Sequence, residues 1–263
     1  MRAPFIFFCY NITKMKKPEN EQKLHDVNRL PKQPGLLIFY ISPSKIGNIQ
    51  NAKNCFDWME HFTGEKNCKV TLKQMGLNFI YGDYLYLFSC EQANSLRDKL
   101  LGQISSHKYN FLKIFNKAPW YIDKGVSFTT WNQTILDTKE YNSFYGQLKK
   151  IYKKDKEFQQ YVKEDSKEMG RKLDQNQVNF ILEEILLFYL IAKGKTRLRN
   201  NFVHEQHKWI LNCYPGKPLK SEMYLFQKNF FKLDYPINKY QNDYYDLEAK
   251  RLYEYDKIDL ANF

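Results

Sequence analysis

The sequence lacks the cysteine and histidine spacing of a zinc site or of a disulfide framework. Its five cysteines form an odd set without a Cys-x-x-Cys pair: Cys9, Cys55, Cys68, Cys90 and Cys213. Disulfide frameworks belong to oxidising compartments and usually come in even, patterned sets. We therefore expect reduced thiols in a cytoplasmic protein and no structural zinc.

Long hydrophobic runs are also absent. No run approaches the roughly 20 residues that a membrane-spanning helix needs, and the apolar segment 3–10 is only eight residues long. A single Arg2 precedes this segment and no small-residue cleavage pattern follows it, so we expect no signal peptide. The chain has no long linker rich in glycine, serine or proline, which favours one domain with a sizeable core.

Acidic residues are few relative to basic ones. Lys and Arg number 41 against 29 Asp and Glu, which gives a formal net charge of +12. Such a balance is typical of proteins that bind a polyanion, with nucleic acid as the first candidate and an anionic membrane surface as the second. The alternative is a solubilising lysine excess from a compositionally biased genome, which the abundance of Lys, Asn, Tyr and Phe favours.

The segment 36–41 is a continuous apolar run with Gly35 before it and Ser42-Pro43 after it. Continuous apolarity predicts a strand that is covered on both faces, as in a parallel α/β sheet. Because Pro43 cannot continue a central strand, we expect Ser42 at the carboxyl edge of the sheet, where ligands bind in open α/β folds. The alternative role for Ser42 is to cap a helix that begins near Asn48.

These patterns divide the chain into three segments. We expect a leader or edge segment at 1–34, the α/β domain at 35–230, and a C-terminal tail at 231–263 that is helical or partly disordered. Strand patterns recur at 77–82, 126–131 and 210–214. Helical patterns occupy 51–62, 91–117 with an interruption at Ser105-Ser106, 141–152, a charged and solvated 157–172, and 177–193. Strands that alternate with helices indicate a mostly parallel sheet.

The segment 177–193 is apolar on nearly every face, so we expect a central helix with Asp174 as its N-cap. Glu183 and Glu184 interrupt it, and a carboxylate among hydrocarbon is costly unless it is paired or opens into a polar cavity. Phe180 shares a helix face with Glu184, four residues later. We therefore expect Glu184 at a functional site, and Glu183 on the more polar side, reaching a lysine at the rim.

Two further groups of side chains carry alternatives. His204 and His207 are three residues apart, but no third ligand accompanies them, so we expect no metal site. The helix expected at 91–117 presents cations that either contact nucleic-acid phosphates or form an ordinary solvated face. The cations in question are Arg97, Lys99, Lys113 and Lys117.

Three short motifs follow one another in a recognisable order. Ser42-Pro43 ends an aliphatic strand, Phe180-x-x-x-Glu184 runs into an aliphatic helix, and Cys213-Tyr214-Pro215 ends a strand 30 residues after the glutamate. Over 36–215 this arrangement resembles the tRNA-dependent cyclodipeptide synthases, and the Tyr-Pro ending resembles one of their two subfamilies. The resemblance implies a single Rossmann-like domain similar to class I tyrosyl- and tryptophanyl-tRNA synthetases. The sequence has neither a His-x-Gly-His nor a Lys-Met-Ser-Lys-Ser motif, which fits a relative without ATP chemistry.

The resemblance also implies roles for individual residues. Ser42 is the expected nucleophile, Glu184 the acid that binds the substrate α-ammonium, and Tyr214 a residue that orients the substrate. Two positions depart from the family: Tyr40 replaces a glycine, and Phe180 replaces a tyrosine. The substrate-binding residues that we expect are Ile38, Tyr40, Phe180, Leu187 and Pro215. Those that we expect to bind tRNA are Arg97, Lys99, Lys113 and Lys117.

The activity that the resemblance implies joins the aminoacyl groups of two aminoacyl-tRNAs into a cyclic dipeptide through a seryl aminoacyl-enzyme. Because the substrate ester is already activated, the expected enzyme is a monomer that needs neither ATP nor a metal, and supplies positioning and proton transfer. Two alternatives stay open. One is a catalytically silent RNA-binding protein of the same fold, which Tyr40 and Phe180 favour, and the other is a ligase that delivers the aminoacyl group to another acceptor.

Overall fold

The computed structural model describes residues 35–63, 75–83, 93–117, 126–136, 138–193, 209–230, 232, 243–255 and 257–263. The leader expected at 1–34 lies outside these residues, and so do His204 and His207. None of the helices in the described part of the chain is both long enough and apolar enough to cross a membrane.

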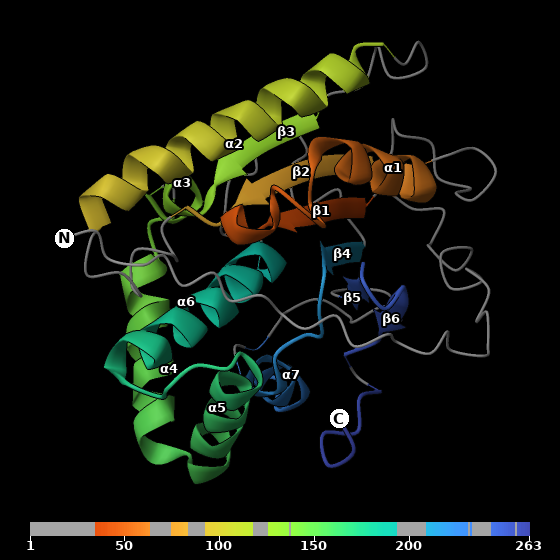
Figure 1. The fold of residues 1–263 in the computed structure, drawn as a ribbon. Coiled ribbons are helices and arrows are strands. Elements are labelled where there is room, and N and C mark those ends of the chain that lie inside the picture. The colour runs from red at the N-terminus through yellow and green to blue at the C-terminus, as the bar shows by residue number, and fades with distance from the viewer. Residues whose placement is uncertain are drawn as a thin grey trace.

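A six-stranded sheet forms the centre of the molecule (Figure 1). Its strands, in the order β3-β2-β1-β4-β5-β6, are β1 (Gly35–Ile41), β2 (Met75–Tyr81), β3 (Val126–Thr130), β4 (Trp209–Tyr214), β5 (Asp243–Asp246) and β6 (Arg251–Tyr253). All neighbours from β3 to β5 pair in parallel, and β6 pairs antiparallel with β5 at the edge. The predicted α/β fold with a mostly parallel sheet is confirmed.

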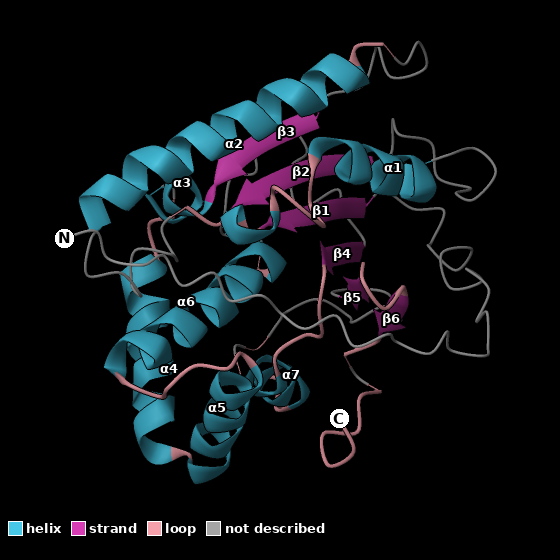
Figure 2. Cartoon of the chain, viewed as in Figure 1, coloured by secondary structure: helices cyan, strands magenta, loops and turns pink. Residues whose placement is uncertain are grey.

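Helices cover both faces of this sheet (Figure 2). One face carries α1 (Ala52–Thr63) and α2 (Ala93–Phe115). Packed on the other face, directly or through another helix, are α3 (Trp131–Leu136), α4 (Tyr141–Lys154), α5 (Lys156–Glu168), α6 (Gln175–Ala192) and α7 (Lys220–Gln227). A short 3-10 helix, η2 (Pro43–Lys45), follows β1 directly.

The strand β1 supplies both cores. Leu37, Phe39 and Ile41 point toward α1 and α2, whereas Leu36 and Ile38 point toward α6. None of the five is more than 1% exposed. The continuous apolar run is therefore a strand covered on both faces, as predicted.

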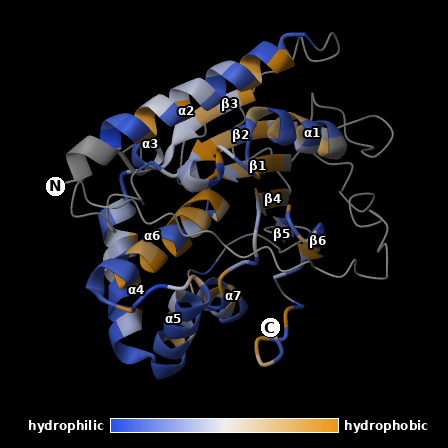
Figure 3. Ribbon diagram, viewed as in Figure 1, coloured by the Kyte–Doolittle hydropathy of each residue, from blue (hydrophilic) through white to orange (hydrophobic). Residues whose placement is uncertain are grey.

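The helix α6 is the central helix that the sequence predicts. Fourteen of its 18 residues are buried. Its colouring in Figure 3 is mostly apolar, whereas α4 and α5 are mostly hydrophilic. The carboxylate of Asp174 accepts a hydrogen bond from the Gln177 N–H at 2.8 Å, so the predicted N-cap is confirmed.

Two helices differ from their expected form. The helix α2 runs through Ser105 and Ser106 without interruption, because both serines lie on its exposed side and disturb no packing. The expected solvated helix, α5, buries Phe158 and Val162, and its Asp165 accepts hydrogen bonds from the backbone at the start of α7. The many charged residues of this segment predicted a fully solvated helix, whereas one face of α5 is buried.

The expectation of a C-terminal tail at 231–263 is wrong, because residues in this segment extend the sheet. The strand β5 pairs in parallel with β4, and all four of its residues are buried. Tyr245 packs edge-on against Phe62 on one face, and Tyr244 packs near Phe188 on the other. The strand β5 buries a tyrosine ring on each face of the sheet, whereas β1 buries mostly aliphatic side chains. A pattern based on aliphatic residues therefore misses β5.

The structure describes two of the cysteines, Cys55 and Cys213, and both are free and buried. Burial raises the pKa of each thiol, so both are uncharged at neutral pH. Cys9, Cys68 and Cys90 lie outside the described residues.

Candidate active site

The order of the strands reverses between β1 and β4. The chain runs outward from β1 through β2 to β3, and then continues on the other side of β1 with β4 and β5. In doubly wound sheets, ligands bind at such a reversal, in the crevice beyond the carboxyl ends of the strands. Ser42 follows the last residue of β1, and Tyr214 is the last residue of β4. The sheet topology therefore places both hydroxyl groups at the crevice.

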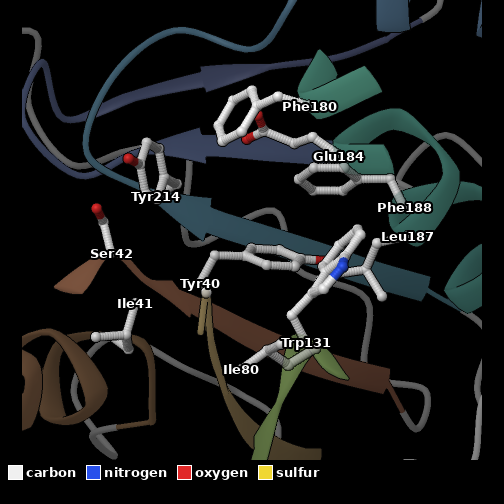
Figure 4. Close-up of a pocket in the computed structure, with 11 residues that line it drawn as sticks. Tyr40, Ile41, Ser42, Ile80, Trp131, Phe180, Glu184, Leu187, Phe188 and Tyr214 are labelled. Carbon is white, nitrogen blue, oxygen red and sulfur yellow. The ribbon is translucent and has the colours of Figure 1, made fainter. Parts of the chain in front are cut away.

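A pocket with a cavity volume of about 60 Å³ opens at this edge. Its lining comes from β1, β2 and the residue that follows each of them, and from β4, α3 and α6: Tyr40, Ile41, Ser42, Ile80, Gly82, Trp131, Phe180, Glu184, Leu187, Phe188 and Tyr214. In Figure 4 the hydroxyl groups of Ser42 and Tyr214 point into the same space, and Glu184 reaches toward it from α6. Apolar walls with a few convergent polar groups are typical of a small-molecule site.

Ser42 is held at the turn that ends β1. Its N–H donates to Gln50 Oε1 at 2.8 Å, and its C=O accepts from the Lys45 N–H at 2.9 Å. Its hydroxyl lies 2.9 Å from the hydroxyl of Ser44 and makes no capping hydrogen bond. The alternative role as a helix cap is filled by Asn51, whose side chain accepts from the Asn54 N–H at the start of α1. Ser42 therefore does not serve as a helix cap, and it lines the pocket.

Glu184 enters the pocket from the middle of α6 and is partly accessible there. Burial raises the pKa of its carboxyl group to about 7, and the nearby cations Arg171 and Lys45 oppose this shift. A carboxyl group with this pKa exchanges protons readily near neutral pH. Its ionised form is suited to bind an ammonium group that enters the pocket.

Glu183, the residue before Glu184 on α6, is not part of the pocket lining and lies under α4. Hydrogen bonds from Tyr141 and Tyr145 and the charge of Lys149 act on its carboxylate, but burial dominates and raises its pKa to about 7. Glu183 is only 2% exposed, so the expectation of a polar, rim-facing position is wrong. The reason is that α4 covers this side of α6 with aromatic side chains, which the helical pattern of α6 alone does not reveal.

Tyr214 shares its end of the pocket with Lys45. The Lys45 ammonium group lies 4.6 Å from the centre of the Tyr214 ring and donates to the Pro215 C=O at 2.5 Å. Burial lowers the pKa of Lys45, and the carboxylates of Glu248, Asp246 and Glu184 oppose this shift. The cation therefore holds the turn after β4 against η2, and so fixes Tyr214 relative to Ser42.

Tyr40 and Phe180, the two departures from the family pattern, both line the pocket. The Tyr40 hydroxyl donates to Asn212 Oδ1 at 2.9 Å, and its ring lies 4.5 Å from that of Phe188. The guanidinium group of Arg171 lies 4.7 Å from the centre of the Phe180 ring. Contacts within the protein thus hold both rings in place at the pocket, where Tyr40 comes from β1 and Phe180 from α6 (Figure 4).

Comparison with solved structures identifies the fold. A cyclodipeptide synthase from Fluoribacter dumoffii aligns with a TM-score of 0.53 over 84% of this chain and 92% of that one, at 12% sequence identity. The chain has the cyclodipeptide synthase fold. A synthase from Staphylococcus haemolyticus aligns with a TM-score of 0.49 over 78% of this chain and 87% of that one, at 12% identity.

A third structure is a Mycobacterium tuberculosis protein whose structure relates cyclodipeptide synthetases to type I tRNA synthetases. It aligns with a TM-score of 0.47 over 72% of this chain and 76% of that one, at 16% identity. By sequence, no protein-family model and no curated protein matches the chain. The likeness to the cyclodipeptide synthases is thus one of fold.

Two residues expected to bind substrate in this fold lie outside the pocket lining. Ile38 is 0% exposed and packs in the core beneath α6. It points to the same face as Tyr40, but the two-residue repeat of a strand places it about 7 Å deeper. Pro215 is buried beside the pocket, where its carbonyl binds Lys45. Of the five residues, Tyr40, Phe180 and Leu187 line the pocket.

Sequence analysis missed Trp131 as a lining residue, because it placed this residue at the end of a strand. Trp131 instead begins α3, and its indole ring is 2% exposed against the pocket. The Thr130 hydroxyl accepts from the Gln133 N–H at 3.2 Å, which is the N-cap contact of this helix. The capping-box spacing from Thr130 to Gln133 is the signal that marks the start of the helix.

Of the four cations expected to bind tRNA, three lie on α2, on the far side of the sheet from α6, and Lys117 lies in the turn directly after this helix. All four are exposed: Arg97, Lys99, Lys113 and Lys117. Within the described ranges, no group of three or more His, Cys, Asp or Glu side chains is arranged to hold a metal ion.

Proposed function

We propose that the protein is an aminoacyltransferase that uses two aminoacyl-tRNAs to form a cyclic dipeptide through a seryl aminoacyl-enzyme. The observation that carries this proposal is the convergence of Ser42, Glu184 and Tyr214 on one pocket at the strand reversal of a cyclodipeptide synthase fold. The Tyr214-Pro215 sequence at the end of β4 supports the Tyr-Pro subfamily.

The first step transfers the aminoacyl group to the enzyme. The Ser42 hydroxyl oxygen attacks the carbonyl carbon of the aminoacyl-tRNA ester and forms a new ester bond. The bond to the terminal ribose oxygen breaks, and this oxygen leaves with a proton, so that free tRNA departs. One ester replaces another of similar energy, so the step requires no ATP, and no metal is proposed.

Glu184 and Tyr214 bind and orient the aminoacyl group in this proposal. The ionised carboxylate of Glu184 holds the α-ammonium group, and its pKa of about 7 allows it to take a proton from that group when the amine has to react. Tyr214, fixed by Lys45, directs its hydroxyl into the same space. These contacts hold the ester near Ser42, which is the main contribution required for an activated substrate.

The second step forms the peptide bond. The α-amine of a second aminoacyl-tRNA attacks the seryl ester, which releases the Ser42 hydroxyl and leaves a dipeptidyl ester on the tRNA. The free amine of that dipeptide then attacks its own ester carbon, which closes the ring and releases the tRNA. The exposed cations of α2 are proposed to contact the phosphates of the tRNA while a monomer carries out both steps.

Tyr40 and Phe180 favour a second candidate, a silent RNA-binding protein of this fold. Tyr40 is anchored to Asn212 and Phe188, so its ring occupies space that a glycine would leave to the substrate. A third candidate, a ligase that delivers the aminoacyl group to another acceptor, would use the same first step.

Mass spectrometry of extracts from cells that express the protein distinguishes the three candidates. Cells expressing Ser42→Ala serve as the matched control. The proposed function predicts cyclic dipeptides that appear with the wild type and not with the variant. Aminoacylated products of another kind would identify the ligase, and no new product with intact tRNA binding would identify the silent RNA-binding protein.

A further inference from the structure

Gln50 lies in the loop between η2 and α1, and its side chain is fully buried at 0% exposed. Its carboxamide makes two hydrogen bonds with the backbone at the end of β1. The oxygen accepts from the Ser42 N–H at 2.8 Å, and the nitrogen donates to the Tyr40 C=O at 2.6 Å. These two backbone groups flank Ile41, the last residue of the strand.

The pairing of β1 with β4 ends just before this point. Phe39 lies opposite Cys213 in the last pair, so a ladder continued by two residues would place Pro215 opposite Ile41. The Ile41 C=O accepts from Gly82 N–H on the β2 side at 2.9 Å. The neighbouring backbone groups, which alternate along a strand, therefore face β4.

In a parallel ladder, one residue donates its N–H to one of these groups and accepts with its C=O from the other. Pro215 cannot do both, because proline has no N–H. Its carbonyl is also engaged by Lys45. The Gln50 carboxamide offers one donor and one acceptor to the same two groups, so it stands in for the strand residue that Pro215 cannot provide.

We propose that Gln50 is a positioning residue: its carboxamide completes the sheet at Ile41 and so sets the direction in which Ser42 presents its hydroxyl to the pocket. This inference rests on the proposed function, because it takes Ser42 as the nucleophile. The support is rigid, since the Gln50 N–H donates to the Lys45 C=O at 2.9 Å and its C=O accepts from Cys55 Sγ at 3.6 Å.

The same contact limits how the reaction is stabilised. The Ser42 N–H is engaged by Gln50, and Pro43 has no N–H, so neither amide donates to the negative charge that develops on the ester oxygen. We assign that donation to a side chain that lines the pocket, such as Tyr214.

The first test is Gln50→Met, which removes both hydrogen bonds at similar side-chain volume. Single-turnover transfer of label from aminoacyl-tRNA, charged with a mixture of radiolabelled amino acids, reports the rate of Ser42 loading. We expect this rate to fall on the order of 10²-fold, as for a small misplacement of a reacting group. The Kd for the same aminoacyl-tRNA is expected to stay unchanged, because Gln50 does not line the pocket.

The matched control is Gln227→Met. The Gln227 carboxamide also binds the backbone, donating to the Tyr255 C=O at 3.2 Å and the Ile258 C=O at 2.7 Å, but it lies on α7 and away from the pocket lining. The Gln227→Met substitution therefore also removes two hydrogen bonds between a side-chain amide and the backbone. We expect Gln227→Met to load Ser42 at the wild-type rate, whatever its Tm.

A second variant, Gln50→Glu, adds a readout that lost stability would not change. When protonated, the new carboxyl group accepts from Ser42 N–H and donates to Tyr40 C=O as the carboxamide does; when ionised, it cannot donate. We therefore expect the ratio of its loading rate to that of the wild type to rise as the pH falls. The titratable groups packed nearby are Lys45 on η2, Cys55 on α1, Tyr81 on β2 and His107 on α2. All four are present in both proteins, so their titration cancels in the ratio.

Loading of Gln50→Met at the wild-type rate, or an equal loss of loading in Gln227→Met, would contradict the positioning role and leave the proposed function standing. A ratio for Gln50→Glu that does not change with pH would also contradict it. Absence of loading in the wild type itself would refute both the positioning role and the proposed function.

Discussion

The face of the sheet that α1 and α2 cover is packed with aromatic rings, whereas the face that α6 covers also buries carboxyl groups. On the first face, Phe39 stacks on Phe79 at 5.1 Å, and Phe79 packs against Phe111 at 4.8 Å. On the second face lie Glu183, Glu222 and the pocket residue Glu184. Burial raises the pKa of all three carboxyl groups.

This difference separates stability from chemistry. Hydrocarbon packing stabilises the fold, while a buried carboxyl group costs free energy whenever it ionises. Substitutions of the buried aromatic residues on the α1 and α2 face should therefore change the free energy of unfolding and leave the reaction of the folded protein unchanged. Where a carboxyl group on the α6 face serves the reaction, its substitution should change the reaction and leave the stability of the fold largely unchanged.

Among substitutions on these two faces, Glu184→Gln has the largest expected effect. It keeps the side-chain volume but removes the charge that binds the α-ammonium group, so we expect cyclic product to fall about 10²- to 10⁴-fold. Ser42 loading is expected to be slow or normal. In the wild type, product formation should rise as the pH rises through about 7, because the carboxylate form increases there. Product is measured by mass spectrometry across this range. Full product from Glu184→Gln, with the same pH dependence, would remove Glu184 from the reaction.

Phe111→Ala tests the opposite face. The Phe111 ring is 0% exposed and packs against Phe56, Phe79 and Phe128, so its truncation is expected to cost about 3–5 kcal/mol of unfolding free energy. Denaturant unfolding measures this loss. Product formation per folded molecule should equal that of the wild type. A Phe111→Ala variant that is stable but inactive would contradict the assignment of stability to this face and of the reaction to the other.

Simultaneous replacement of the four exposed cations on α2 and in the turn after it should act through binding alone. The variant carries alanine in place of Arg97, Lys99, Lys113 and Lys117. Each phosphate contact that is lost should reduce the slope of log K against log salt by about one unit. Titration of tRNA binding at several salt concentrations measures the slope. An unchanged slope would identify this surface of α2 as an ordinary solvated face.

Glu183→Gln has the smallest expected effect on activity and sharpens the comparison within α6. Burial raises the pKa of Glu183 to about 7, so the folded protein binds the proton more tightly than the unfolded chain. This contribution to stability is present at acidic pH and is lost as the pH rises through about 7. We expect the variant to gain on the order of 1–3 kcal/mol at pH 8 and less at pH 5. Denaturant unfolding at both pH values tests this. An inactive Glu183→Gln beside an active Glu184→Gln would reverse the assignment.

The sequence predicts those parts of the fold whose pattern is long and local. Segment 36–41 and the helix at 177–193 each carry an unbroken apolar pattern, and Ser42 and Glu184 are located by where these elements end or are interrupted. The strand β5 was not predicted in this way, because the rings that it buries on its two faces are tyrosines and not aliphatic side chains. Periodicity also assigns a face but no depth, and for this reason Ile38 was expected in the pocket and lies beneath it.

The contacts that complete the site depend on segments far apart in the chain. Gln50 carries no local signal, since its role follows from Pro215 ending the ladder of a strand 165 residues later. The covered position of Glu183 likewise depends on α4. Such relations become visible only when the register of the strands and the packing of the helices are known.

Labelling of Ser42 tests the central claim most directly. The wild type and Ser42→Ala are incubated with tRNA charged with radiolabelled amino acids, and the protein is then denatured and separated from the tRNA. The hydroxyl adds little to packing, so the variant should fold with an unchanged Tm. We predict that label stays covalently bound to the wild type and is absent from Ser42→Ala. Equal labelling of the two proteins, or no label on either, would contradict the assignment of Ser42 as the nucleophile.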